Sequence, residues 1–384
     1  MLWRGLQLFG AAWDSPLQLG SEYKWFAGSL QEKGTDMALQ AVLWEKDATR
    51  EGWVRCRLCA HSCRIAEGAS GRCRMRVNRQ GILYSLCSDK ISVVNIDPIE
   101  KKPLFHYLPG SSTCSLGTPG CNFLCAFCQN HELSQGEIPS FERILDVFPP
   151  QTTADIIRRA KKTGAASIAF TYNEPTISVE LIGALAPAAC DAHMGTVLVS
   201  NAYIGKEGMA HLRSLIRAAN FDIKAFNDHF YRRLCGAKLA PVLRTITEAL
   251  SFGWWVELTT LLIPGLNDSD AEMTKLARFI KEDCGKDVPW HLSRFHPMFR
   301  LRHVPATPVE TLERARAIGL AEGLHYVYTG NVPGHDGEST YCPCCGQRVI
   351  RRAGYRTHLP AKPCCSSCGA GIPGVWGKTE RNDL

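Results

Sequence analysis

The stretch Gly117-Thr-Pro-Gly-Cys-Asn-Phe-Leu-Cys-Ala-Phe-Cys-Gln-Asn130 contains three closely spaced cysteines, Cys121, Cys125 and Cys128. Their spacing, C-x3-C-x2-C, supplies three thiolates and no fourth cysteine nearby. Structural zinc sites and ordinary four-iron clusters take four protein ligands, so three thiolates leave one metal position open. Phe127 is expected to pack beside whatever occupies that position. The alternatives are a zinc loop that borrows a distant Cys or His, and three unrelated thiols.

The composition indicates a globular metalloprotein. The chain has 384 residues, of which 45% are hydrophobic and 18 are cysteines. The cysteines fall in clusters with metal-ligand spacing, which favours a reducing, cytoplasmic compartment over a disulfide framework. No apolar run reaches the roughly 20 residues that span a bilayer, and no signal peptide is recognisable. The net charge of +7 is too diffuse to indicate a nucleic-acid partner.

The chain divides into four expected segments: a poorly ordered extension (1–36), an N-terminal Cys-rich module (37–111), a central barrel (112–335) and a C-terminal zinc-ribbon-like module (336–384). Met37 offers a second start, and the run 37–46 predicts a short helix. The length allows two or three domains with full cores.

The central segment alternates short apolar runs with helical stretches. The predicted strands are near 115–117 and at 167–171, 196–200, 221–224, 256–262, 290–295 and 326–329. Helix starts are expected at Thr152 or Thr153, near Pro241, at Asp268 or Ser269, and at Pro308. This alternation predicts an α/β fold in which a parallel sheet forms a full or partial TIM-type barrel.

Polar residues gather after these predicted strands. Glu174 follows the second run, Asn201 the third, Asp222 and Lys224 the fourth, and His291 marks the sixth. Because barrel chemistry sits at the carboxyl ends of the strands, we expect these side chains to surround a cofactor or substrate above the cysteine loop. The alternatives are structural: a core histidine for His291, and a plain ion pair for Asp222 with Lys224.

Two C-x2-C pairs near the C-terminus predict a zinc ribbon with the ligands Cys342, Cys345, Cys365 and Cys368. Each pair is followed by glycine, which lets the backbone turn its amides toward sulfur. Cys344 and Cys364 compete as ligands, and a rubredoxin-like iron site or a further iron–sulfur cluster is the alternative.

A second set of four cysteines lies near the N-terminus, with ligand-like spacing: Cys56, Cys59, Cys63 and Cys73. Four cysteines in eighteen residues are hard to explain by packing. The spacing suits zinc or an auxiliary iron–sulfur cluster equally, and inert buried thiols are the alternative.

The cysteine loop resembles the C-x3-C-x-aromatic-C signature of radical S-adenosylmethionine (SAM) enzymes. The similarity extends to the AmmeMemoRadiSam system radical SAM proteins, relatives of the pyruvate formate-lyase activating enzymes. It is carried by the N-terminal cysteine module and by residues 97–106, 170–175, 222–224, 263–268, 294–297 and 329–331. The similarity that these segments mark extends over nearly all of residues 38–376.

The resemblance implies that Cys121, Cys125 and Cys128 hold a catalytic [4Fe-4S] cluster whose open iron chelates SAM. Reduction by a flavodoxin- or ferredoxin-like donor would then yield a 5′-deoxyadenosyl radical, which abstracts hydrogen from an unidentified substrate. Glu174 stands where relatives have Gly-Gly-Glu and would bind the SAM amino group. Asn201 matches a SAM contact, and Asp222 with Lys224 match an Asp-x-Lys motif near the substrate.

Two other functions remain open from the sequence. The first is an activase that places a glycyl radical on a partner protein. The second is a non-catalytic protein that uses its clusters and zinc for electron transfer or as a scaffold, and it predicts no SAM turnover.

Overall fold

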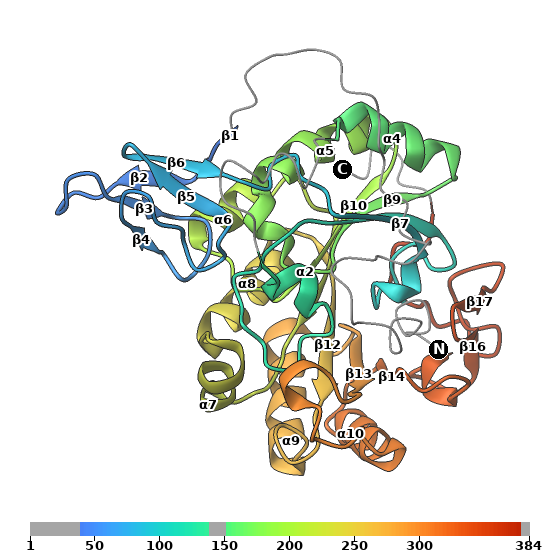
Figure 1. The fold of residues 1–384 in the computed structure, drawn as a ribbon. Helices are drawn as coiled ribbons and strands as arrows, with labels where there is room; N and C mark the ends of the chain where they lie inside the picture. Colours follow the sequence, from blue (N-terminus) through green and yellow to red (C-terminus); the bar gives the residue numbers. More distant parts are fainter. Residues whose placement is uncertain (1–38, 138–150, 378–384) are drawn as a thin grey trace, which may run out of the picture.

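The computed structural model describes residues 39–137 and 151–377, so the expected extension 1–36 lies outside the described residues. Its centre is one eight-stranded sheet in the order β14-β13-β12-β11-β10-β9-β8-β7. The seven strands β8 to β14 are parallel, and β7 pairs antiparallel with β8. Because β7 and β14 are the two edges of this sheet, the barrel is partial (Figure 1).

Strands β8 to β14 overlap the seven predicted apolar runs, whereas β7 was not predicted. Their bounds are β7 Val93–Pro98, β8 Ser112–Gly117, β9 Ser167–Phe170, β10 Gly195–Ser200, β11 Ala218–Asp222, β12 Trp255–Leu262, β13 Trp290–Arg294 and β14 Val327–Gly330. Strand β7 precedes residue 112, so the large sheet begins earlier than the expected start of the barrel segment. Burial of each large apolar side chain of these strands contributes about 1.5–3 kcal/mol.

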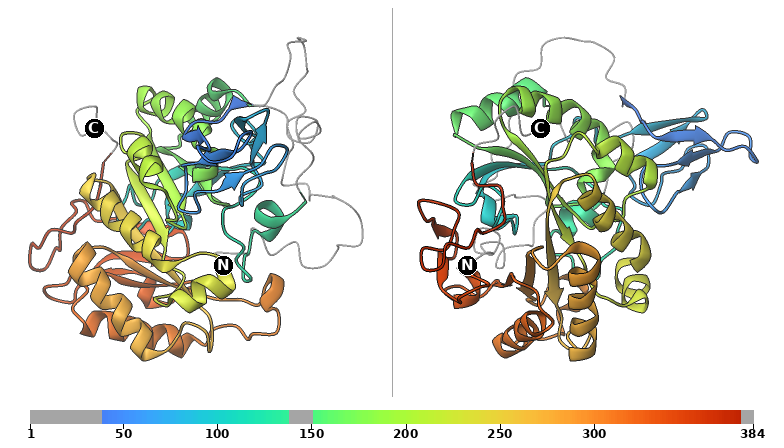
Figure 2. Two further views of the ribbon diagram at one scale, coloured as in Figure 1. Left: turned by 90° about the vertical axis from the view of Figure 1, so that its left-hand side faces the viewer. Right: turned by 180° about the vertical axis from the view of Figure 1, so that it is seen from behind.

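Helices cover the outer face of the sheet (Figure 2). The longer ones are α4 Thr153–Lys162, α5 Val179–Asp191, α6 Lys206–Leu212, α8 Leu239–Ser251, α9 Asp270–Phe279 and α10 Val309–Ala321. Shorter turns are η1 Ile99–Lys101, α2 His131–Gln135, η2 Pro175–Ser178, α7 Asp228–Phe230, η3 Tyr231–Cys235, η4 Ile280–Cys284, η5 Phe299–Leu301 and η6 Asp336–Glu338. Among the described residues, every helix is too short or too polar to cross a membrane.

Two of the four predicted helix starts are confirmed by side-chain caps, and the helix predicted near Pro241 begins at Leu239. The Thr152 side chain accepts from the Asp155 amide at 3.2 Å, and Ser269 accepts from the Glu272 amide at 3.3 Å. These bonds satisfy amides that the first helical turn leaves unpaired. Pro308 is the N-cap of α10, and Gly164, with a φ of 68°, follows the end of α4.

The short helix predicted at 37–46 is wrong in its described part. β1 (Leu39–Gln40) pairs with β6, and β2 (Trp44–Lys46) pairs with β3. Pairing with strands elsewhere in the chain overrides the local helix propensity of this run. The N-terminal module therefore consists of two small sheets, β1-β6-β5 and β2-β3-β4, whose other strands are β3 Val54–Cys56, β4 Arg64–Ile65, β5 Arg76–Arg79 and β6 Ile82–Ser85.

The C-terminal module is a three-stranded sheet of β15 (Thr340–Tyr341), β16 (Arg348–Ala353) and β17 (Arg356–His358). The chain then returns to the barrel. The Val375 carbonyl accepts from the Leu108 amide at 2.7 Å, and the Val375 amide donates to the His106 carbonyl at 2.7 Å. The last described residues thus pair with a segment that precedes the first parallel strand.

Candidate active site

The cysteine loop begins where β8 ends, at the carboxyl edge of the parallel strands. Backbone bonds hold it against η3: the Leu124 amide donates to the Cys235 carbonyl and the Ala126 amide to the Leu234 carbonyl, both at 2.9 Å. Cys125 is buried within this loop. The loop is thereby fixed at the edge where barrel chemistry takes place.

Of the three thiols of the loop, Cys125 is buried and Cys121 and Cys128 are partly buried. Burial raises the pKa of Cys128 to about 11 and the pKa of Cys121 well above its ordinary value. The Cys128 sulfur lies 3.1 Å from the Ser134 hydroxyl, and the Phe123 amide donates to Cys121 Sγ at 3.4 Å. Metal binding at these thiols would release protons, since only thiolates are ligands.

Asn122, next to Cys121, is fully buried and was missed in the sequence. Its Oδ1 accepts from Asn201 Nδ2 at 2.8 Å, while its own Nδ2 has no hydrogen-bond partner among the described residues. A buried unpaired donor costs about 1–3 kcal/mol, so this position calls for an acceptor. An anionic iron–sulfur cluster or the carboxylate of SAM supplies one, and the loop therefore fits the group that its cysteines imply.

Glu174 lies in the loop after β9 and is almost fully buried. Its carboxylate accepts from the Asn201 amide at 2.8 Å, from the Ser200 hydroxyl at 2.8 Å, and from the hydroxyl and amide of Thr176. Burial raises the pKa of Glu174. In this structure Glu174 joins the ends of β9 and β10, and all of its observed bonds are to the chain itself.

Asn173 replaces a glycine of the Gly-Gly-Glu pattern and has its own role. Its Nδ2 donates to the Gly120 carbonyl at 2.9 Å and to the Thr118 hydroxyl at 3.0 Å. Its Oδ1 accepts from the Thr118 amide at 3.2 Å. An asparagine where the Gly-Gly-Glu pattern has a glycine is the sequence signal that could have revealed this contact with the cysteine loop.

Asp222 ends β11, and Lys224 follows two residues later. Their side chains form an ion pair of 2.7 Å. Burial would lower the pKa of Lys224, but Asp222 and the neighbouring Cys125 raise it overall, so the ammonium stays charged. Lys224 is therefore close enough to the cysteine loop to interact electrostatically with Cys125.

A further thiol lies beside Cys125. The Cys235 thiol and burial both raise the pKa of Cys125. Cys235 itself is fully buried on η3. The sequence gave no indication of this contact, because Cys235 has no cysteine near it along the chain.

Phe127 packs into the core, with its ring 5.7 Å from that of Phe230 between centroids. It is 3% exposed. The structure thus gives Phe127 a packing contact with Phe230 of α7.

His291 lies elsewhere than expected. It is the second residue of β13, in the amino-terminal half of the strand, so it does not mark the carboxyl edge. Its Nε2 lies 2.7 Å from the buried carboxylate of Glu257, and its ring stacks on Tyr328 at 5.2 Å. Glu257 also accepts from the amides of Phe105 and His106. His291 is thus buried and paired with Glu257 in this structure, as in the alternative of a core histidine weighed from the sequence.

Another polar network centres on Asp97 of β7, which lies opposite Thr113 near the start of β8. The Asp97 carboxylate pairs with Lys102 at 2.7 Å and with Lys101 at 2.9 Å, and it accepts from the Tyr172 hydroxyl at 2.7 Å. Burial alone would raise the pKa of Asp97, but the two lysines and Tyr172 hold it below its usual range. Tyr172, with a φ of 74°, directly precedes Asn173.

The C-terminal cysteines form a compact set. Sγ of Cys342 lies 3.5 Å from that of Cys368, and Sγ of Cys345 lies 3.5 Å from that of Cys365. Zinc-bound thiolates lie about 3.8 Å apart, because Zn–S bonds are about 2.3 Å long. All four sulfurs lie within 4.8 Å of one another, so the competing Cys344 and Cys364 are outside the set. Metal could be held here by a zinc-ribbon-like module.

The N-terminal cysteines come together in their module as well. Cys56 ends β3, and its amide donates to the Cys63 carbonyl at 2.9 Å. Burial raises the pKa of Cys59, and its neighbours Cys56, Cys73 and Cys63 raise it further. The four thiols are therefore neighbours, although no three of them come within the 4.8 Å that the C-terminal set satisfies.

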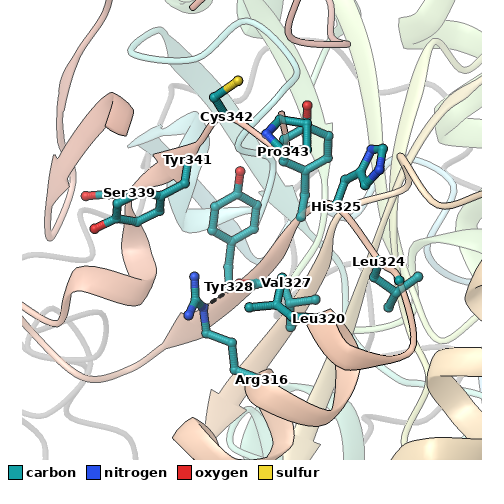
Figure 3. Close-up of a pocket in the computed structure, with 12 residues that line it drawn as sticks. Arg316, Leu320, Leu324, His325, Val327, Tyr328, Ser339, Tyr341, Cys342 and Pro343 are labelled. Atoms are coloured by element: carbon teal, nitrogen blue, oxygen red, sulfur yellow. Dashed lines mark hydrogen bonds between the residues drawn. The ribbon is translucent and has the colours of Figure 1, made fainter. Parts of the chain in front are cut away.

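A cavity of about 350 Å³ lies between α10, β14 and the C-terminal module (Figure 3). Tyr328, Tyr341 and Cys342 are in its walls, and Arg316 Nε there donates to the Val327 carbonyl at 2.9 Å. It includes no residue of the cysteine loop, so its size does not identify it as the reaction site.

Comparison with known proteins agrees with the geometry of the cysteine loop. The model of the Radical SAM superfamily matches residues 115–277. The chain is also 42% identical over 316 residues to the uncharacterized protein MJ0808 of Methanocaldococcus jannaschii, covering 82% of this chain and 91% of that protein. The chain belongs to the radical SAM superfamily. Radical SAM proteins are enzymes that use a [4Fe-4S] cluster and SAM, so the non-catalytic alternative is set aside.

This radical SAM enzyme is also similar to a protein named as a putative activating enzyme. The M. jannaschii protein named "Putative glycyl-radical enzyme activating enzyme MJ1632" is 27% identical over 198 residues, covering 50% of this chain and 71% of that protein. A solved domain of pyruvate-formate lyase-activating enzyme from Bacteroides vulgatus ATCC 8482 has a TM-score of 0.38 at 16% identity, covering 44% of this chain and 100% of that chain.

Proposed function

We propose that Cys121, Cys125 and Cys128 hold the [4Fe-4S] cluster and that its open iron binds SAM, so that the enzyme abstracts hydrogen from a substrate. When bound, the cluster and SAM supply the chemistry: one electron cleaves SAM to methionine and a 5′-deoxyadenosyl radical. The observation that carries the proposal is the buried, unpaired Nδ2 of Asn122 in the loop of the three cysteines, of which Cys125 is buried and the other two are partly buried.

The remaining residues bind, orient and exclude water. Glu174 fixes the turn that holds Asn201, and Asn201 in turn fixes Asn122. Lys224 keeps its charge through Asp222 and places a cation beside the cluster loop, where it would position an anionic group of the substrate or SAM. A flavodoxin- or ferredoxin-type protein would deliver the electron. Four thiolates at the C-terminus would hold zinc.

The test is reductive SAM cleavage by Cys125→Ala, measured as 5′-deoxyadenosine after anaerobic reduction with dithionite. We expect cleavage to be abolished. The matched control is Cys114→Ala, which removes a buried thiol of β8 outside the loop and should cleave SAM normally. Unchanged 5′-deoxyadenosine from Cys125→Ala with its cluster intact would refute the assignment.

The second candidate is an activase acting on a partner protein, and the relationship to MJ1632 favours it. Either reaction is oxidoreductase or lyase chemistry of the activating-enzyme kind. The two are distinguished by where the hydrogen comes from. Deuterium that moves from a labelled small molecule into 5′-deoxyadenosine supports a small substrate, whereas transfer only from a labelled partner protein supports the activase.

A further inference from the structure

The N-terminal cysteines differ from the C-terminal set in the spacing of their sulfurs. Among residues 39–137 and 151–377, the only group of three or more candidate ligand atoms within 4.8 Å of one another is the C-terminal one. No three sulfurs of Cys56, Cys59, Cys63 and Cys73 therefore lie mutually within 4.8 Å, whereas four zinc-bound thiolates lie roughly 3.8 Å apart. In this they match the cysteines of the catalytic loop. The thiolates of an iron–sulfur cubane each bind a different iron and lie farther apart than zinc ligands.

A buried cation lies beside these sulfurs. Arg76 is 1% exposed, its Nη1 lies 3.6 Å from Cys56 Sγ, and its guanidinium pairs with Glu180. Its Nε has no hydrogen-bond partner among the described residues. The Arg72 amide also donates to Cys63 Sγ at 3.5 Å. An unpaired buried donor together with hydrogen bonds to sulfur points to an anionic group, and such bonds tune the potential of iron–sulfur clusters.

The module touches the catalytic loop directly. A Cβ built on Gly120 would lie 2.9 Å from the Cys73 carbonyl, and His61 Nε2 lies 2.9 Å from the Asn122 carbonyl. The Cys73 backbone therefore lies beside Gly120, the residue that directly precedes Cys121. Cys59 is only partly buried, so the same set of thiols also approaches the surface.

We propose that Cys56, Cys59, Cys63 and Cys73 bind a second iron–sulfur cluster that relays single electrons to the cluster of the catalytic loop. Four thiolates leave no iron open, so this cluster carries electrons and does not chelate a substrate. In one transfer the external flavodoxin- or ferredoxin-type donor is oxidised by one electron and the catalytic cluster is reduced by one. The second cluster returns to its starting state, and no bond is formed or broken.

The metal content of the anaerobically purified full chain tests the site. We expect about eight iron, eight sulfide and one zinc per chain, since each four-thiolate or three-thiolate cubane adds about four iron. The double variant Cys59→Ala/Cys63→Ala should lose half of its iron and keep its zinc. The triple variant Cys121→Ala/Cys125→Ala/Cys128→Ala should keep the other half, with an electron paramagnetic resonance signal that SAM does not change.

The control is Cys87→Ala, which removes a buried thiol of the same module whose Sγ contacts the Ile177 carbonyl at 3.6 Å. It should retain all of its iron. A triple variant free of iron, or a second zinc that leaves with Cys59 and Cys63, would overturn the proposal. The iron content and spectrum of the triple variant report on the second cluster without SAM turnover. This result is therefore independent of the proposed function.

The electron relay, unlike the binding of a second cluster, rests on the proposed function. It is tested by a separate measurement. In the double variant, reduction of the catalytic cluster by a reduced flavodoxin should be lost, while reduction by the small molecule dithionite should be retained. The spectroscopic signal of the reduced catalytic cluster reports both. Equal reduction by flavodoxin in the wild type and the double variant would refute the relay.

Discussion

The side-chain amide of Asn201 donates to Oδ1 of Asn122 over 2.8 Å, which joins the turn after β10 to the residue that follows Cys121. The Oδ1 of Asn201 accepts from the Tyr203 amide at 3.0 Å. Both polar atoms of Asn201 are thus engaged within the chain, and its observed contact is with the cysteine loop.

Replacing Asn201 is expected to loosen that loop. Asn201→Ala leaves the buried Asn122 side chain without its partner, which should lower the free energy of unfolding by about 1–3 kcal/mol and weaken SAM binding. Asn201→Asp keeps the shape but turns an acceptor toward Asn122 Oδ1, so it should weaken SAM binding at least as much. Urea unfolding and anaerobic equilibrium dialysis measure the two effects. Wild-type SAM affinity in both variants would contradict the prediction.

The contact between the N-terminal module and the catalytic loop is tested at Gly120. A Cβ there would overlap the Met75 side chain, and the backbone has a φ of 85°. Gly120→Ala should therefore destabilise the protein. Gly81→Ala is the matched control, because its φ is 72° and nothing lies within 4 Å of its Cβ position.

The difference between the two glycine variants isolates the steric contact from the backbone strain that they share. We expect Gly120→Ala to lower the free energy of unfolding by about 1–3 kcal/mol more than Gly81→Ala, as measured by urea unfolding. Equal losses would show that the two segments are not in tight contact in solution.

The ion pairs of Asp97 should make stability depend on pH. Lys102, Lys101 and Tyr172 hold the pKa of Asp97 below its usual range against the effect of burial. A carboxyl with a lowered folded-state pKa stabilises the protein above its unfolded pKa of about 3.9, and this stabilisation is lost as pH falls below that value. Asp97→Asn should lack this part of the acid dependence.

Asp97→Asn should also cost about 3 kcal/mol near neutral pH, because it leaves the buried Lys102 without its partner. The difference in unfolding free energy between wild type and variant should shrink from about pH 5 toward pH 2. Urea unfolding across this range measures it. A difference that stays constant with pH would be inconsistent with the proposed pairing.

His291 is expected to act on stability and not on SAM. His291→Ala leaves the buried Glu257 without one of its hydrogen-bond partners, so the free energy of unfolding should fall by about 1–3 kcal/mol. SAM affinity in anaerobic equilibrium dialysis should be unchanged, because His291 lies in the amino-terminal half of β13. Selective loss of SAM affinity with normal stability would restore the role expected from the sequence.

Local signals predicted much of the fold. Thr152 and Ser269 cap helices through bonds to residues three positions away, so their short-range pattern is sufficient to locate the helix starts. The 37–46 run depends on pairing with distant strands, which no local pattern contains. Likewise, the alternation along β13 predicts the face of the sheet on which His291 lies. It does not predict how far along the strand His291 lies from the carboxyl end.

In the candidate site, too, features set by nearby residues were predicted and features set by distant residues were not. Cysteine spacing predicted the C-terminal ligand set, because each pair sits in one turn. The partners of Asn122 come from His61 and Asn201, which are 61 and 79 positions away in sequence. Contacts at such separations are set by how the modules pack, and a single sequence does not show them.

The pairing of Val375 with residues 106–108 has a consequence for the order of folding. Residues 106–108 precede β8 and Val375 follows the C-terminal module, so all the parallel strands lie between the two partners in the chain. Closing so long a loop costs conformational entropy before the contact rewards it, and we therefore expect this pairing to form late in folding. A chain made without ribosomes, refolded from denaturant, would pass through the same order of events.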